Sequence, residues 1–195
     1  MGLNWEFTGG ETKLDPDEIS GLRIPLITTR AELDEYEQAN IQRARIWLNK
    51  RQQRTSAVLS EAFVKRLHKE MYNDVWQWAG QFRKTEKNIG VDPVRIATDV
   101  RQLLDDALFW VEHATYAPDE IAVRVKHRIV SIHCFANGNG RHSRLLADVL
   151  AKALGQPLFT WGARTDMPDV RERYFDALWK GDRGDIIPLI EFARS

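Results

Sequence analysis

The chain has 195 residues, of which 43% are hydrophobic and 29% are charged, a composition that suits one globular domain with a real core. The 28 Lys and Arg residues balance 28 Asp and Glu residues, which argues against a general binder of nucleic acid or of membrane surfaces. No apolar run is long enough to span a membrane, the N-terminus lacks a signal-peptide pattern, and the single cysteine excludes an internal disulfide. We therefore expect a cytoplasmic protein.

The first part of the chain predicts an arm followed by two helices. Residues 1–27 show no clean period, so we expect them to form an arm lying on the domain. A helix is predicted next, because Thr29 and Glu32 have the spacing of a capping box and a helical stripe continues through "ELDEYEQANIQRARIW". A second helix is predicted over about 60–72, where bulky residues recur at every fourth position.

The stretch "NDVWQWAGQFRKTEKNIGVDP" breaks the helical pattern with its tryptophan, glycine and proline residues. It predicts a turn followed by a short β-hairpin around Phe82 to Val91. The rest of the chain predicts helices over about 94–113, 118–133, from near Gly140 onward, 168–180 and 184–193. An all-α helical bundle with one short hairpin is therefore expected.

The stretch "HCFANGNGRHSR", residues 133–144, connects two of these helices. Gly138 and Gly140 can adopt backbone angles closed to other residues, so the loop can turn several N–H groups toward an anion. The next helix directs its free N–H groups to the same place, and Arg141 and Arg144 in its first turn oppose the helix dipole unless an anion binds there. Together these features indicate a polyphosphate site.

Two polar residues add chemistry to this stretch. Asn139 offers an amide, and His133 can act as a general base near neutral pH, so transfer of a phosphate-bearing group to a nucleophile is indicated. Taken alone, a histidine at a helix end is usually a packing or capping residue, and a Gly-Asn-Gly run is usually a turn. Cys134 is interpreted as a buried thiol, and His127 and His142 lack the spacing of a zinc helix with His133.

The same stretch resembles the signature of the Fic (filamentation induced by cAMP) family, HxFx(D/E)GNGRxxR. The upstream "LHKEMYNDVWQWAGQFR" resembles the helix and WAGxxR element of that family, and "RYFDALWKGDRGDIIPLIEFARS" resembles its closing helices. The resemblance covers about 55–195, which leaves 1–54 as an N-terminal arm and helix packed on the core. The pattern "ITTRAELDEYEQANI" is closest to the subgroup called mobile mystery protein B.

The resemblance implies a helical enzyme that moves AMP from ATP to a hydroxyl side chain of a target protein, with Mg²⁺ or Mn²⁺. It implies that His133 is the base, that Phe135 anchors the loop, that Asn139 holds the α-phosphate, and that Arg141 and Arg144 hold the β- and γ-phosphates. The full phosphate-binding set would be Asn137, Gly138, Asn139, Gly140, Arg141 and Arg144. The predicted hairpin would be the family's flap, which aligns the target by strand addition and contains Arg83, Lys84, Thr85, Asn88, Ile89 and Gly90.

Two positions depart from the family pattern. Cys134 replaces the usual proline, and Asn137 replaces the acidic residue that helps to hold Mg²⁺, for which an amide is a weaker ligand. The second departure leaves two alternatives to AMP transfer open. One is phosphate transfer of the kind that the related Doc toxin performs, and the other is a nucleotide-binding module without catalysis.

Many Fic proteins are inhibited by a helix carrying (S/T)xxxE(G/N), whose glutamate pairs with the second arginine of the signature. Here Thr28 and Glu32 have that spacing, and Glu37 is a second candidate on the same predicted helix. The alternative is that both glutamates are solvated or capping groups. In that case the resemblance implies a toxin-like regulator held by a small antitoxin-like helix-turn-helix partner, with no direct contact to nucleic acid or membrane.

Overall fold

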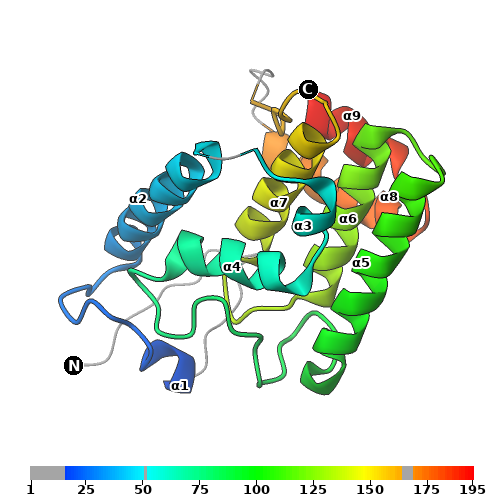
Figure 1. Cartoon of the computed structure of the whole chain (residues 1–195). Coiled ribbons are helices and arrows are strands. Elements are labelled where there is room, and N and C mark those ends of the chain that lie inside the picture. The colour runs from blue at the N-terminus through cyan, green and yellow to red at the C-terminus, as the bar shows by residue number, and fades with distance from the viewer. Residues whose placement is uncertain (1–15, 51, 164–168) are drawn as a thin grey trace.

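The computed structural model describes residues 16–50, 52–163 and 169–195, which form a bundle of helices (Figure 1). The helices are α1 (Pro16–Ile19), α2 (Arg30–Asn49), α3 (Thr55–Val58), α4 (Glu61–Tyr72), η1 (Pro93–Arg95), α5 (Ile96–Glu112), α6 (Pro118–Ile132), α7 (Asn139–Ala153), α8 (Val170–Asp182) and α9 (Ile187–Arg194). Helices α6 and α7 pack against each other, α5 lies along α6, α2 packs on α4, and α8 packs on α9. The predicted all-α fold is confirmed.

The predicted helices agree closely with those of the structure. The helix expected over 94–113 is α5, which is preceded by the single 3₁₀ turn η1, and those expected over 168–180 and 184–193 are α8 and α9, displaced slightly toward the C-terminus. The short helices α1 and α3 were not predicted. Four residues are too few for a hydrophobic period to appear.

The arm predicted before α2 lies on the body of the molecule where the structure describes it, and residues 1–15 are outside the described part. The Arg23 N–H donates to the Val75 carbonyl at 2.8 Å, and the Gln77 N–H donates to the Gly21 carbonyl at 2.8 Å. These bonds attach the chain after α1 to the turn that follows α4.

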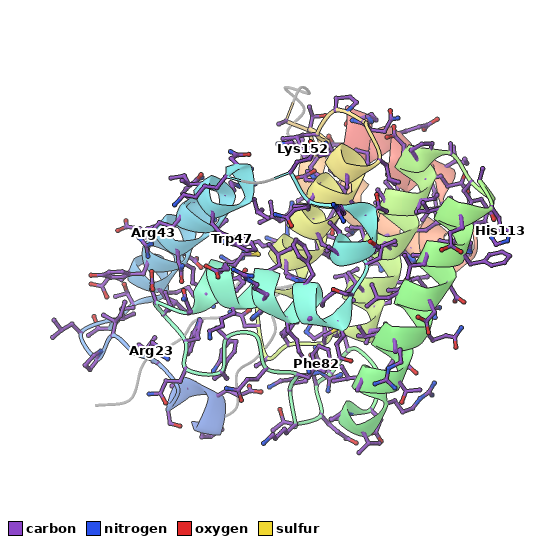
Figure 2. The ribbon with its side chains drawn as sticks, viewed as in Figure 1. Arg23, Arg43, Trp47, Phe82, His113 and Lys152 are labelled. Carbon is purple, nitrogen blue, oxygen red and sulfur yellow. The ribbon has the colours of Figure 1, made fainter. Side chains whose placement is uncertain are left out.

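Helix α2 begins as the sequence predicts. The Thr29 hydroxyl accepts the Glu32 N–H at 3.3 Å, and the Glu32 carboxylate accepts the Thr29 N–H at 3.0 Å, which completes the capping box. Trp47, near the other end of α2 (Figure 2), stacks on Phe63 of α4 with ring centroids 6.3 Å apart. The helix is therefore fixed at its start by a local cap and along its length by α4.

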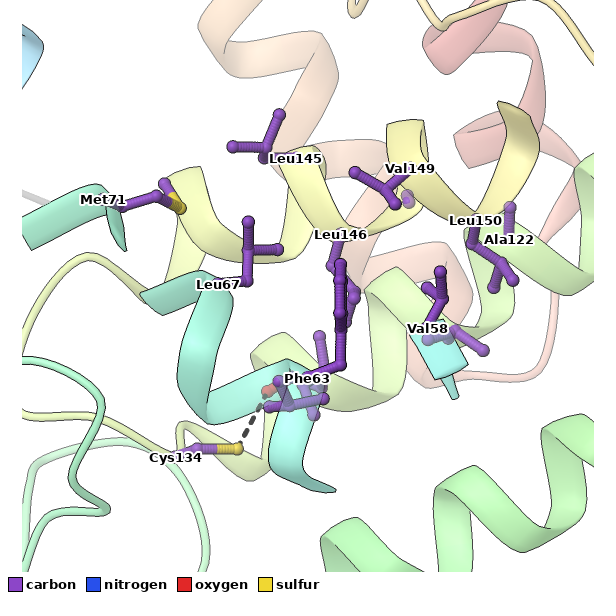
Figure 3. Packing of buried hydrophobic residues seen from close by; sticks show 14 of the residues in the cluster. Val58, Phe63, Leu67, Met71, Ala122, Cys134, Leu145, Leu146, Val149 and Leu150 are labelled. Atoms are coloured by element: carbon purple, nitrogen blue, oxygen red, sulfur yellow. Dashed lines mark hydrogen bonds between the residues drawn. The ribbon is translucent and has the colours of Figure 1, made fainter. Parts of the chain in front are cut away.

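One hydrophobic core runs through the described helices. Leu67 and Met71 of α4 are fully buried and face α7, where Leu146 is also fully buried (Figure 3). Cys134 lies in this core with its thiol 3.9 Å from the Ile129 carbonyl, and burial raises the pKa of that thiol to about 12, so it is an unreactive buried thiol as expected. Across the described residues, no helix is both long enough and apolar enough to cross a membrane.

The predicted β-hairpin is wrong. Residues 82–91, here called the flap segment, form an extended loop without paired strands. The Arg83 guanidinium lies between the two arms of this loop. Its Nη1 donates to the Thr85 carbonyl at 2.7 Å, its Nη2 donates to the Val91 carbonyl, and its Nε donates to the His133 carbonyl at 2.6 Å. A side chain therefore supplies the hydrogen bonds that a strand ladder would have supplied.

Both ends of the flap segment are also attached to the end of α6. The Arg83 N–H donates to the Cys134 carbonyl at 2.9 Å, and the Val91 N–H donates to the Ile132 carbonyl at 3.2 Å. Because these main-chain groups are bonded to α6, they are not available to each other. The flap segment is thus held beside the loop that carries the signature.

Candidate active site

His133 ends α6 in the left-handed conformation, with φ of 57° and ψ of 59°. This conformation costs a residue with a side chain about 1 kcal/mol, and the cost is offset because the His133 carbonyl accepts the Arg83 Nε–H at 2.6 Å. The reversal ends the helix and brings the imidazole to the wall of a cavity. The placement predicted for His133, at the edge of a pocket, is confirmed.

The cavity has a volume of about 660 Å³ and is open to solvent on one side. The signature loop and the first turn of α7 form one wall, and α2, the flap segment, the end of α6 and α8 form the others. The predicted residues that line it are His133, Asn137, Gly138, Asn139, Gly140, Arg141, Arg144, Ile89 and Gly90. Four other predicted flap residues, Arg83, Lys84, Thr85 and Asn88, do not line it.

Sequence reasoning missed two walls of this cavity. Arg30, Asp34 and Gln38 line it from α2, and an aromatic group that includes Phe175 and Trp179 lines it from α8. Trp179 is 62% exposed, which is unusual for so large an apolar side chain and marks the mouth of the cavity. The exposed tryptophan in "FDALWKGD" could not be distinguished from a core residue by periodicity alone.

His133 is neutral at neutral pH. Burial, with further contributions from the cations Arg83 and Lys87, lowers the pKa of His133 to about 4. A neutral imidazole can accept a proton, and an imidazolium cannot. His133 therefore has the protonation state that a general base needs, although its pKa is further below neutrality than the sequence implied.

The two glycines of the loop have different roles. Gly138 has φ of 77°, and a Cβ there would lie 2.5 Å from the Tyr72 ring, so both its backbone and its surroundings require glycine. Gly140 lies in the first turn of α7 without a positive φ, and apart from its chain neighbours and the backbone of its own helix no atom lies within 4 Å of where its Cβ would be. The prediction of special backbone angles is thus wrong for Gly140. What the missing side chain provides there is open space beside the start of α7.

Asn139 shapes the loop. Its Oδ1 accepts the Phe135 N–H at 2.9 Å, and its Nδ2 donates to the Phe135 carbonyl at 2.8 Å. Both ends of the amide thus bind the main chain of the loop, and a role for this side chain at the α-phosphate stays a prediction. Phe135 is fully buried and stacks on His68 with centroids 3.7 Å apart, so the expected anchoring role of Phe135 is confirmed.

Glu37 lies at the other end of the loop. It is completely buried, and its carboxylate accepts the Trp76 Nε1–H at 2.7 Å and the Asn137 Nδ2–H at 3.4 Å, and also forms an ion pair with Arg141. The sequence pattern placed such a pair on the second arginine of the signature, whereas the structure places it on the first. The guanidinium of Arg144 instead lies 5.7 Å from the Tyr174 ring centroid, and its Nε is 3.4 Å from the Gly140 carbonyl.

Glu32, the other candidate inhibitor, has a local role. Its carboxylate accepts the N–H groups of Thr28 at 2.8 Å and Thr29 at 3.0 Å. These hydrogen bonds lower the pKa of Glu32 at a solvent-exposed helix start. The capping interpretation is correct for Glu32, and only Glu37 reaches the signature.

The described residues offer little to a metal ion. Among them, no group of three His, Cys, Asp or Glu side chains is placed to hold one. The Asn137 amide nitrogen faces Glu37, which leaves a single amide oxygen at the position where the family pattern has a carboxylate. A divalent ion would therefore depend on the phosphates of a bound nucleotide for most of its ligands.

Comparison with known sequences matches residues 58–151 to the Fic/DOC family. Over 116 residues the chain is 28% identical to Protein adenylyltransferase Fic from Aedes aegypti and 30% identical to the protein of the same name from Drosophila melanogaster. Each alignment covers 58% of this chain but only 22–23% of the relative. The chain thus spans less than a quarter of the length of these relatives.

Solved structures share the fold. Fic-1 from C. elegans gives a TM-score of 0.66 at 22% identity, covering 90% of this chain and 50% of that one. The BepC protein from Bartonella tribocorum, solved with bound AMPPNP, gives 0.68 at 17% identity, covering 86% and 87%. The signature, the fold and the sequence match agree: this chain carries a domain of the Fic/DOC family, which spans residues 58–151.

Proposed function

We propose that this protein transfers AMP from ATP to a hydroxyl side chain of a target protein. The observation that carries the proposal is that one cavity is lined by the neutral His133, by the loop at the start of α7 and by Arg141 and Arg144. A base and a polyphosphate site within one cavity suit nucleotidyl transfer. The names of the insect relatives, and the nucleotide bound to BepC, support the same activity.

In the proposed reaction, the target hydroxyl oxygen attacks the α-phosphorus of ATP while His133 takes the hydroxyl proton. An ester bond forms between that oxygen and the α-phosphorus, the bond from the α-phosphorus to the bridging oxygen breaks, and pyrophosphate leaves. The N–H groups at the start of α7 and the guanidinium of Arg144 would hold the phosphates. Gly140, with open space beside it, would let the phosphates approach the helix end.

Mg²⁺ or Mn²⁺ would enter with ATP and would neutralise part of the charge on its phosphates. Asn137 is the residue of this chain that would contact it, through one amide oxygen. ATP is the co-substrate in this proposal, and a buried reduced thiol at Cys134 is consistent with action in the cytoplasm.

The contacts of Glu37 support a resting state in which α2 inhibits the site. Glu37 binds Arg141 and so takes the place that a phosphate oxygen would take on that guanidinium. We propose Glu37 as the inhibitory group, which makes a separate antitoxin unnecessary for closing this site. A toxin-like role and a small helix-turn-helix partner rest only on the subgroup resemblance.

Labelled ATP tests the proposal. The Glu37→Gln protein is incubated with a cell lysate and with ATP labelled at either the α- or the γ-phosphate, with Glu32→Gln as the matched control. Protein label from the α-phosphate alone is the expected result. Label from the γ-phosphate alone would establish phosphate transfer of the Doc type, and no label with intact ATP binding would establish a nucleotide-binding module.

A further inference from the structure

Helix α4 contacts the signature loop from the side opposite the cavity. His68 and Tyr72, both fully buried, bind two successive carbonyl groups of that loop, and neither residue lines the cavity. We infer that α4 orients the signature loop, because these two side chains fix the peptide planes whose N–H groups would face the phosphates. The inference rests on the proposed phosphate site, although not on which group is transferred.

The hydrogen bonds of His68 determine its tautomer. Its Nδ1 lies 3.0 Å from the amide nitrogen of Gly80, which can only donate, so Nδ1 carries no proton. Burial lowers the pKa of His68 well below its ordinary value, and the ring is neutral with its proton on Nε2. That Nε2–H donates to the Asn137 carbonyl at 3.1 Å.

The peptide planes of the loop follow from these bonds. In a trans peptide the C=O group and the following N–H group point in opposite directions, and the described chain has no cis peptide. With the Asn137 carbonyl directed to His68, the Gly138 N–H points away from α4. The Tyr72 hydroxyl donates to the Gly138 carbonyl at 3.4 Å, so the Asn139 N–H points the same way, toward the cavity.

The start of α7 leaves these N–H groups available. The first hydrogen bond of the helix runs from the His142 N–H to the Gly138 carbonyl at 2.9 Å, so the earlier N–H groups have no acceptor within the helix. If the peptide between Asn137 and Gly138 rotated, a carbonyl oxygen would face the cavity and repel a phosphate. Gly138 has no side chain to resist that rotation, and the donor on His68 does so instead.

His68 also connects this loop to the turn before the flap segment. Its ring stacks on Phe135 at 3.7 Å with planes 20° apart, and its Nδ1 holds the Gly80 N–H. The imidazole thus has one hydrogen bond on each side and an aromatic ring against its face. These three contacts leave it a single orientation, which is what a positioning residue requires.

His142 offers a matched control. It is a second buried histidine whose pKa burial lowers to about 4, and its ring meets the same Phe135 edge-on at 5.0 Å. Its Nε2, however, lies 3.0 Å from the carbonyl of Val64 within α4 and not from a loop carbonyl. Replacing either histidine by phenylalanine therefore removes a buried neutral imidazole from the same cluster. Only the His68 replacement also removes a hydrogen bond to a carbonyl of the signature loop.

The experiment measures binding of Mg-ATP and of adenosine by calorimetry, in the Glu37→Gln background, together with each variant's melting temperature. His68→Phe should weaken Mg-ATP binding about tenfold, the value of one lost hydrogen bond, and leave adenosine binding unchanged. His142→Phe should lower the melting temperature comparably and change neither affinity. His68→Gln, which can donate and accept, should restore most of the Mg-ATP affinity.

Tyr72→Phe removes only a hydroxyl and keeps the ring. It therefore tests the hydrogen bond to the Gly138 carbonyl even if His68→Phe does not fold. It should weaken Mg-ATP binding by a few-fold and spare adenosine binding. Equal losses in the His68 and His142 variants, or full Mg-ATP affinity in folded His68→Phe or Tyr72→Phe, would overturn the inference. If Mg-ATP binds but no AMP is transferred, the proposed function fails, and the comparison of the two histidines still decides the inference.

Discussion

The two ends of the signature loop are in different states. At one end His133 is neutral, lines the cavity and is ready to accept a proton. At the other end Arg141 is already paired with the buried carboxylate of Glu37. In the proposed reaction the base would be ready while one of the two proposed phosphate-binding cations is occupied, so inhibition would act on anion binding and not on proton transfer.

Removing the base should have the largest effect. In the Glu37→Gln background, His133→Ala should lower AMP transfer by about a hundredfold or more, while Mg-ATP affinity stays within about twofold. Because the pKa of His133 is about 4, the transfer rate should also stay level from pH 8 down to about pH 5 and fall below that. Single-turnover labelling across this pH range measures both, and a rate that falls already between pH 7 and 6 would contradict the assignment.

Replacing Arg141 and replacing Arg144 should change the stability of the folded protein by different amounts. Arg141→Ala leaves Glu37 buried without its cation and should lower the free energy of unfolding by about 2 kcal/mol. Arg144→Ala breaks no ion pair within the described residues and should change the unfolding free energy by less than about 0.5 kcal/mol. Both should weaken Mg-ATP binding. Urea unfolding of the nucleotide-free proteins makes the comparison, and a larger loss for Arg144→Ala would mean that the carboxylate belongs to the second arginine.

Freeing Arg141 should raise activity. Glu37→Gln keeps an acceptor for the Trp76 indole and removes the charge that competes with phosphate, so Mg-ATP should bind about tenfold more tightly. Glu32→Gln should cost at most about 1 kcal/mol of stability through the cap and leave Mg-ATP affinity unchanged. Titration calorimetry on wild type and both variants measures the Mg-ATP affinities to be compared. Equal affinities for wild type and Glu37→Gln would show that Glu37 is structural.

The smallest expected effect concerns the metal. Asn137→Asp replaces a neutral ligand with a charged one, which should lower the Mg²⁺ concentration for half-maximal transfer by a few-fold. The new carboxylate would also lie beside Glu37, so the change should be made together with Glu37→Gln. A magnesium titration of the labelling rate measures it. An unchanged half-maximal concentration would indicate that the phosphates alone hold the ion.

Local signals in the sequence predicted most of the fold. The capping box at Thr29, the helical stripes and the loop before α7 depend on residues a few positions apart, and the structure has each of them. The hairpin was predicted wrongly because the main chain of the flap segment bonds to α6, a contact between distant segments. The Arg83 side chain then fills the space between its arms.

For the site, the sequence predicted which residues lie together better than it predicted what each of them contacts. The pair of Glu37 with Arg141 joins positions 104 apart, and no local pattern could indicate which arginine the glutamate would reach. Nor could the sequence show that the main chain of Phe135 binds both ends of the Asn139 amide, a side chain predicted to hold a phosphate. The α8 wall of the cavity was missed for the same reason, since its residues lie far along the chain.

The hydrogen bond from the Trp76 indole to Glu37 gives the proposed inhibited state an optical signature. The indole donates to that carboxylate at 2.7 Å and stacks on Trp78 at 4.8 Å, and the ring is fully buried. A carboxylate at the indole nitrogen alters both the wavelength and the yield of its emission. If Glu37 moves away from both Arg141 and Trp76 when a nucleotide binds, this emission changes, so intrinsic fluorescence, compared with that of a Trp76→Phe protein, would follow the proposed opening of the site without any label.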